Sequence, residues 1–146
     1  MSGPGAIVSL VTLGVSDLAR SIAFYEALGF GRKAKSAQGV GFFQAGATAL
    51  AVWPAAELAN DAQVALAGTR GTFRGVALAW NCRSEHEVDD ALARASAAGA
   101  TTPKPAQKTS WGGYAGYFAD PDGHLWEVAH NPGFPLSDDG RLQLPD

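Results

Sequence analysis

Apolar residues along the chain alternate between strand-like runs and helix-like spacing, and the same order of elements occurs twice. The first half predicts one helix and four strands, the strands at 7–15, 30–35, 40–44 and 48–53. The second half repeats this order, with strands at 75–82, 100–108, 114–118 and 125–128. Each half is therefore predicted to form a βαβββ module.

Both predicted helices carry start and stop signals. Ser16 or Asp17 can cap the first helix, and Gly29 ends it. Ser84 begins a capping box for the second helix, in which the serine accepts from a first-turn amide and the glutamate three residues later reaches back. Gly99 ends that helix. The second helix is expected to bury one apolar stripe, formed by Val88, Ala91, Leu92 and Ala95.

Short sequence matches support an internal repeat. The matched pairs are Gly41–Phe43 with Gly116–Phe118, Leu50–Val52 with Trp126–Val128, and Leu13–Val15 with Leu78–Trp80. We predict a single domain that spans 1–146. Its parts are module one at 6–54, an Ala-rich linker at 55–72 with room for a short helix, module two at 73–132, and a polar C-terminal tail at 133–146.

Composition and charge narrow the classes of function. Hydrophobic residues make up 47% of the chain, which is ample for a packed core. The net charge is −3 and no basic run is present, so nucleic acid is not an expected partner. The apolar runs are too short for a bilayer, and no signal peptide is evident, so no membrane association is expected. Because Cys82 is the single cysteine, we expect a cytoplasmic protein without an internal disulfide.

One carboxylate needs a functional explanation. Glu127 lies among apolar residues in the second strand of a hairpin, whose turn is Asp120-Pro-Asp-Gly123. A carboxylate at a buried strand position costs free energy unless it is paired, protonated or bound to something. Glu127 is therefore the candidate catalytic residue, as a general acid or base. The alternative interpretation is that it accepts hydrogen bonds from Trp or Tyr, or pairs with Arg.

Other residues are candidates for the same site. A second polar group normally stabilises developing charge, and large aromatics line many pockets for planar ligands. Trp111 precedes two glycines and is a candidate lid. The predicted substrate-binding residues are Thr12, Trp53, Arg74, Trp111, Tyr114 and Tyr117. We expect a small-molecule ligand, aromatic compounds being among the candidates.

A metal site built from Glu127 and the two nearby histidines is not expected. His124 and His130 each lie three residues from Glu127. Side chains alternate along a strand, so Glu127 points away from both. The sequence instead predicts His124 at the turn and His130 at the strand end.

Two stretches resemble the signatures of the vicinal oxygen chelate superfamily, which includes glyoxalase I, bleomycin-resistance proteins and extradiol dioxygenases. They are Thr12-Leu-Gly-Val-Ser-Asp-Leu-Ala-Arg-Ser21, leading into Phe24–Gly29, and Phe118-Ala-Asp-Pro-Asp-Gly-His-Leu-Trp-Glu127. The resemblance covers about 6–132. It implies an α+β fold in which two βαβββ modules form a curled mixed sheet around a cavity. It also implies a homodimer.

The resemblance further implies a divalent metal held by the first and last strands of each module. The corresponding positions in this chain are Leu10, Ala51, Gly75 and Glu127. Only Glu127 can coordinate, whereas a catalytic metal needs about three protein ligands. We therefore predict no metal-ligating residues and no cofactor. A different alignment of the strands with the family's ligand positions would keep a divalent metal as an alternative.

Three classes of function remain open. The sequence slightly favours a metal-independent small-molecule-binding protein that acts in the manner of bleomycin-resistance proteins. The second class is a metal-dependent enzyme of the superfamily, either a lactoylglutathione-lyase-like lyase or a dioxygenase. The third is a ligand-free interaction module. Whether the protein is an enzyme is left undecided.

Overall fold

Two βαβββ modules follow one another along the chain, with an extra helix between them. The structure is a computed structural model that describes residues 5–66 and 72–146. The elements are β1 (Leu10–Val15), α1 (Leu18–Leu28), β2 (Gly31–Lys33), β3 (Gly41–Ala45), β4 (Thr48–Pro54), α2 (Ala55–Ala62), β5 (Ala77–Asn81), α3 (Glu85–Ala97), β6 (Thr101–Lys108), β7 (Tyr114–Ala119) and β8 (Leu125–His130). Of the predicted linker, residues 67–71 lie outside the described part of the chain.

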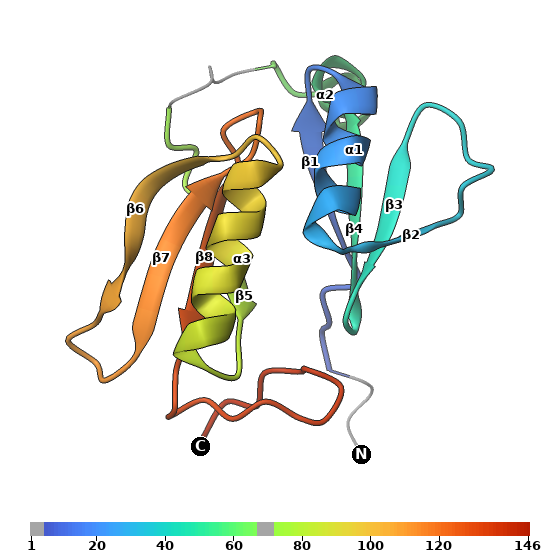
Figure 1. Ribbon diagram of the computed structural model, residues 1–146. Coiled ribbons are helices and arrows are strands. Elements are labelled where there is room, and N and C mark those ends of the chain that lie inside the picture. The colour runs from blue at the N-terminus through green and yellow to red at the C-terminus, as the bar shows by residue number, and fades with distance from the viewer. Residues whose placement is uncertain (1–4, 67–71) are drawn as a thin grey trace.

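Each module forms its own four-stranded mixed sheet. The strand orders are β1-β4-β3-β2 and β5-β8-β7-β6, with parallel pairing of β1 to β4 and of β5 to β8. Strands β1 and β5 are edge strands, each on the side of its sheet that faces the other module (Figure 1). The predicted α+β fold of two βαβββ modules is confirmed, but the two sheets are not joined into one closed sheet.

Helices α1 and α3 cover the same side of the two sheets, the side that faces the viewer in Figure 1. The side chain of Asp17 accepts from the amide of Arg20, and Gly29 ends α1 with a φ of 100°. Ser84 accepts from the amide of Glu87. The carboxylate of Glu87 reaches back to the amide of Arg83, one residue earlier than a capping box predicts.

A single apolar core joins the helices to both sheets. On α1, the ring of Tyr25 lies 6.0 Å from that of Phe43 in sheet one and 6.0 Å from that of Trp126 in sheet two. Trp126 and Val128 face this core, as the strand alternation predicted. The fully buried side chains include Val15, Phe43, Val52, Val88, Phe118 and Val128. Burial of these aromatic and aliphatic groups is the main force that holds the two modules together.

The opposite side of the sheets has less cover. Alternation along the strands turns Leu10, Thr12, Ala79 and Glu127 away from α1 and α3. We call this side the open face. Helix α2 covers one end of it, since a Cβ on Gly14 would lie 3.0 Å from the Cβ of Ala55.

The pairing register corrects one sequence match. Leu13 pairs with Val52, and Trp80 pairs with Val128, which is the counterpart of Val52 in module two. Leu13 therefore corresponds to Trp80, and its predicted match to Leu78 is wrong by two residues. The helix caps, Asp17 and Ser84, have the same spacing as Leu13 and Trp80. The error arose because both strands are runs of similar small and branched residues.

The C-terminal tail folds back across the lower end of module two in Figure 1. Leu136 and Leu142 form an isolated bridge, and the amide of Gln143 donates to the carbonyl of Pro135 over 2.9 Å. Among the helices of the described residues, none has the length and apolar character needed to cross a membrane.

Candidate functional site

A cavity of about 290 Å³ lies at the seam between β1 of module one and the β5–β8 pair of module two. We call it the seam cavity. Its lining is formed by Val11, Thr12, Leu13, Phe73, Arg74, Val76, Leu78, Gly123, His124 and Leu125. Two of the predicted binding residues, Thr12 and Arg74, therefore meet here, although they are far apart in sequence. The walls are mainly apolar, and the polar groups come from three side chains.

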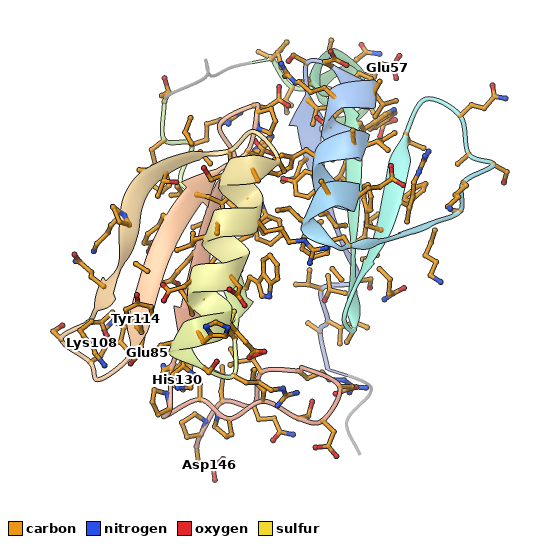
Figure 2. The ribbon with its side chains drawn as sticks, in the orientation of Figure 1. Glu57, Glu85, Lys108, Tyr114, His130 and Asp146 are labelled. Carbon is orange, nitrogen blue, oxygen red and sulfur yellow. The ribbon has the colours of Figure 1, made fainter. Side chains whose placement is uncertain are left out.

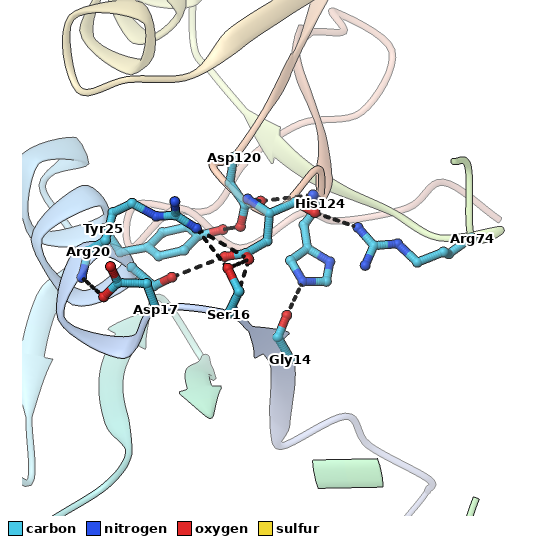
Figure 3. A network of polar contacts seen from close by, with 10 residues as sticks. Gly14, Ser16, Asp17, Arg20, Tyr25, Arg74, Asp120 and His124 are labelled. Carbon is cyan, nitrogen blue, oxygen red and sulfur yellow. Dashed lines mark hydrogen bonds and ion pairs between the residues drawn. The ribbon is translucent and has the colours of Figure 1, made fainter. Parts of the chain in front are cut away.

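The turn between β7 and β8 holds two of these polar side chains in place. Nη2 of Arg74 donates to the carbonyl oxygen of Asp122 over 3.0 Å. Nε2 of His124 lies 2.7 Å from the carbonyl oxygen of Gly14 in β1 (Figure 3). A carbonyl only accepts, so Nε2 of His124 is the donor in this contact.

The same turn also connects module two to the start of α1 by hydrogen bonds. The carboxylate of Asp122 accepts from the amide of Ser16 over 2.9 Å and from its hydroxyl over 2.7 Å. Arg20 also contacts this carboxylate, at 3.4 Å. The network in Figure 3 thus joins both modules at one rim of the seam cavity.

Asp120 is the buried anchor of this network. It is 3% exposed, and one carboxylate oxygen accepts from the amides of Asp122 and His124. Its other oxygen accepts from the hydroxyl of Tyr25 over 2.6 Å. Burial, and then the charge of Asp120, raise the pKa of Tyr25 well above its ordinary value, so this tyrosine remains a donor.

Glu127 has a partner within the protein. It lies opposite Tyr117 in the β7–β8 ladder. Burial raises the pKa of Tyr117, and the charge of Glu127 and its hydrogen bond to the phenol raise it further. This pairing matches the alternative interpretation, in which Glu127 accepts from a tyrosine. Glu127 lines none of the four cavities described among residues 5–66 and 72–146.

The remaining predicted residues lie elsewhere. Tyr114 faces α3, where its hydroxyl donates to Asp89 over 2.7 Å (Figure 2). Tyr117 lies opposite Glu127, and Tyr114 is three positions away from Tyr117 on the same strand, so it points to the other face. The prediction that Tyr114 shares a hollow with Glu127 is therefore wrong. Trp53 is half-buried opposite Gly14 and does not line the seam cavity.

Trp111 belongs to the turn between β6 and β7, at the other end of β7 from the seam cavity. It is 49% exposed, and its ring covers Gly113 so closely that a Cβ there would lie 1.9 Å from Cζ3. Since the ring rests on its own turn, Trp111 is not a lid over the seam cavity.

The positions implied for metal ligands do not form a donor set. With the corrected register, the first-strand position of module two is Ala77 rather than Gly75. Leu10, Ala51 and Ala77 have no coordinating atom, which leaves Glu127 alone. Within the described residues, no three His, Cys, Asp or Glu side chains converge as a metal site would require. These residues do not fit the divalent metal.

The two histidines lie where the alternation placed them. His124 is at the turn, and Nδ1 of His130 lies 3.1 Å from the carbonyl oxygen of Cys82. What sequence reasoning missed is that His124 faces β1 across the seam. The signal available was the dipeptide Gly123-His124 after an Asp-Pro-Asp turn, but the position of β1 could not be read from it.

The whole chain is similar to known proteins. Residues 7–128 match the model of the Glyoxalase/Bleomycin resistance protein/Dioxygenase superfamily. A glyoxalase-related enzyme from Fulvimarina pelagi is 38% identical, with a TM-score of 0.86 over 96% of this chain and 99% of that one. A glyoxalase/bleomycin resistance protein/dioxygenase from Nocardioides is 25% identical, with a TM-score of 0.72 over 93% of each chain.

A more distant structure shows the fold alone. Lactoylglutathione lyase from Agrobacterium tumefaciens is 24% identical, with a TM-score of 0.66 over 88% of this chain and 96% of that chain. No curated protein matches the chain.

Proposed function

Because the chain belongs to the glyoxalase/bleomycin resistance protein/dioxygenase superfamily, we propose that it binds a small organic molecule without a metal ion. The observation that carries the proposal is the seam cavity, where Thr12, Arg74 and His124 meet over apolar walls. A few polar groups over an apolar lining is the usual composition of a small-molecule site.

The charges around the cavity favour an anionic ligand. Among the described residues that line it, Arg74 and His124 are the ionisable ones. The nearby carboxylate of Asp122 is occupied by Ser16 and Arg20. The guanidinium of Arg74 donates one N–H group to a backbone carbonyl, and within the described residues its other N–H groups remain for a ligand. We therefore propose an aromatic carboxylate as the ligand class, with its ring against Phe73, Leu13 and Leu78.

The chemistry of the donor positions supports the proposed metal independence. A single carboxylate among four implied positions cannot hold a catalytic metal ion. The lyase or dioxygenase alternative would need donors that the described residues do not provide. The catalytic role of Glu127 stays a prediction, since its pairing with Tyr117 already accounts for a half-buried carboxylate.

A homodimer is the assembly that we propose. Large apolar side chains lie exposed along both sides of the seam, and the exposed fractions are 83% for Ile7, 68% for Val8, 45% for Leu10, 70% for Phe73 and 62% for Val76. A cluster of this kind is typical of an interaction surface. A second copy over the open face would cover these side chains and complete the walls of the seam cavity.

We also propose a cytoplasmic location, because of the single cysteine. Cys82 is a free, buried thiol, which suits a reducing compartment.

Ligand binding at the seam cavity can be tested with a matched pair of probes. Benzoate and benzyl alcohol have similar rings, but only benzoate carries the charge that Arg74 would bind. In a buffer containing EDTA, we expect benzoate to give a saturable thermal shift that benzyl alcohol does not match. Arg74→Gln should weaken benzoate binding by about tenfold.

Arg141→Gln, in the tail, is the matched control and should leave benzoate binding unchanged. Equal binding of the two probes, or benzoate binding that survives Arg74→Gln, would contradict the proposal. Binding that appears only after a divalent metal is added would contradict metal independence.

A further inference from the structure

A second hollow lies on the other side of the module junction, under the C-terminal tail. It consists of a cavity of about 410 Å³ and an adjoining one of about 250 Å³, which share Trp80, Asn81 and Gly140. We call this hollow the tail groove. We propose that the tail groove binds a second kind of small molecule, a planar ring that carries an amide-like edge.

Two aromatic rings form the apolar part of the tail groove. The ring centroids of Phe30 and Trp80 lie 5.7 Å apart, with the planes inclined by 54°. Phe30 also contacts Trp126 at 5.6 Å, which ties it to the core. Both Phe30 and Trp80 are half-buried and line the larger cavity, so they offer fixed ring surfaces to a planar molecule.

Two polar groups beside these rings have no hydrogen-bond partner among residues 5–66 and 72–146. The indole N–H of Trp126 donates to Tyr25. The indole N–H of Trp80, in contrast, donates to no group within the described residues. The carboxamide of Asn81 likewise makes no side-chain hydrogen bond in that part of the chain. Asn81 is half-buried at the end of β5 and lines both cavities. Both groups lie at half-buried positions that solvent still reaches, so a ligand can enter and supply their partners.

The tail provides a wall that the chain itself holds in position. The amide of Ser137 donates to the carbonyl of Arg141 over 2.8 Å, which closes a small loop that contains Gly140. Nη2 of Arg83 donates to the carbonyl of Ser137 over 2.6 Å and to that of Asp138 over 3.2 Å. The loop is thereby fastened to module two, next to Asn81.

The chemistry of these groups selects the ligand class. A carboxamide can donate and accept in one plane, so it pairs with an edge that presents the complementary acceptor and donor. Amides, lactams and heteroaromatic rings with an amino group share such an edge. The flanking rings of Phe30 and Trp80 favour a flat body. The site differs from the seam cavity, whose polar groups are Arg74, His124 and Thr12.

Benzamide and acetophenone are a matched pair of probes, because they differ mainly in the amide NH₂ that Asn81 would bind. Two-dimensional ¹⁵N NMR resolves the indole N–H and the Asn81 side-chain amide, and Trp80→Phe and Asn81→Leu assign these two signals. We expect benzamide at millimolar concentration to shift both signals in a saturable way. Acetophenone should bind about tenfold more weakly.

Variants separate this site from its surroundings. Asn81→Leu should weaken benzamide binding by about tenfold, as read from the shift of the Trp80 indole signal, whereas Asn60→Leu on exposed α2 should not weaken it. Arg83→Gln, which frees the loop, should also reduce the affinity.

The proposal is overturned if benzamide shifts neither signal or shifts only signals from the seam cavity. It is also overturned if Asn81→Leu binds benzamide as tightly as the natural chain does. Benzoate binding at the seam cavity is a separate measurement, so either site can fail alone.

Discussion

At the scale of single residues, the buried polar groups around Tyr25 are paired with one another. Tyr25 both donates to Asp120 and accepts from the indole of Trp126 over 3.1 Å. These three residues come from α1, the β7–β8 turn and β8, so one hydroxyl links elements of both modules. A buried carboxylate of this kind is tolerated because each of its oxygens has donors.

Tyr25→Phe should therefore lower the free energy of unfolding by about 2 kcal/mol, because it leaves a buried carboxylate and a buried indole N–H each short of a partner. Urea denaturation followed by circular dichroism measures this loss. Tyr114→Phe removes the same group from an exposed pair with Asp89, and its effect should be much smaller. Equal losses in the two variants would show that the buried hydrogen bond from Tyr25 stabilises the fold no more than the exposed one from Tyr114.

Cys82 gives a pH-dependent prediction. Burial raises the pKa of its thiol from 9.0 to about 11, and the charge of Glu87 adds to this. The folded chain holds this proton more tightly than the unfolded chain does. The resulting stabilisation is complete below pH 9 and is lost as the pH rises towards 11.

The measurement is the free energy of unfolding at pH 8 and pH 10.5, compared with that of Cys82→Ala. Between pH 8 and pH 10.5, the free energy of unfolding of the natural chain should fall relative to that of Cys82→Ala. Iodoacetamide should also alkylate the folded protein slowly at pH 8. Rapid alkylation in the native state would contradict the buried environment.

At the scale of elements, the helices approach the sheets closely because glycine lies beneath them. A Cβ on Gly41 would lie 2.7 Å from Ile22 of α1, and one on Gly116 would lie 2.8 Å from Leu92 of α3. The corresponding glycines of the two modules thus serve the same packing contact. Their match in the sequence was a sign of the repeat, and the structure gives its physical reason.

Gly116→Ala should lower the free energy of unfolding by about 2 kcal/mol, because its Cβ would also meet the backbone of β6, 2.7 Å from the amide nitrogen of Ala106. Gly31→Ala is the matched control in a strand, since nothing lies within 4 Å of its Cβ position. That change should have little effect or stabilise slightly. Thermal unfolding measures both variants. A loss of stability in Gly116→Ala alone indicates a packing constraint, whereas equal losses would indicate a general effect of replacing glycine in a strand.

Elements were easier to predict from the sequence than the groups that meet between them. Local signals such as Asp17, Gly29 and Ser84 act within a few residues, and they located both helices correctly. The register of β5 against β8 depends on pairing between distant strands, and there the sequence match failed by two residues. Thr12 and Arg74 were predicted to share a cavity with Glu127. They line the seam cavity instead, which Glu127 does not line, and His124 joins them there only through the fold.

At the scale of the whole molecule, the two modules share one core on the helix side and leave the other side open. The exposed apolar side chains along the seam suggest that the natural unit is a pair of chains. In such a pair, the partner's surface would exclude water from the seam cavity, and the charge of Arg74 would act more strongly on a bound carboxylate.

Val76→Asp should convert a dimer into a monomer, because it places a charge within the proposed apolar interface. Size-exclusion chromatography with light scattering measures the mass directly. Leu144→Asp changes a similarly exposed apolar residue in the tail and should leave the mass at two chains. A natural chain that is monomeric at all accessible concentrations would refute the proposed assembly.

We propose that this chain binds its ligand without a metal ion, in contrast to the divalent metal that the family resemblance implied. The most direct test is elemental analysis of protein expressed with added Mn, Fe, Ni and Zn and purified without a chelator. With Glu127 as the sole donor among the implied positions, metal should amount to less than about one-tenth equivalent per chain. A stoichiometric metal that disappears in Glu127→Gln would contradict the claim.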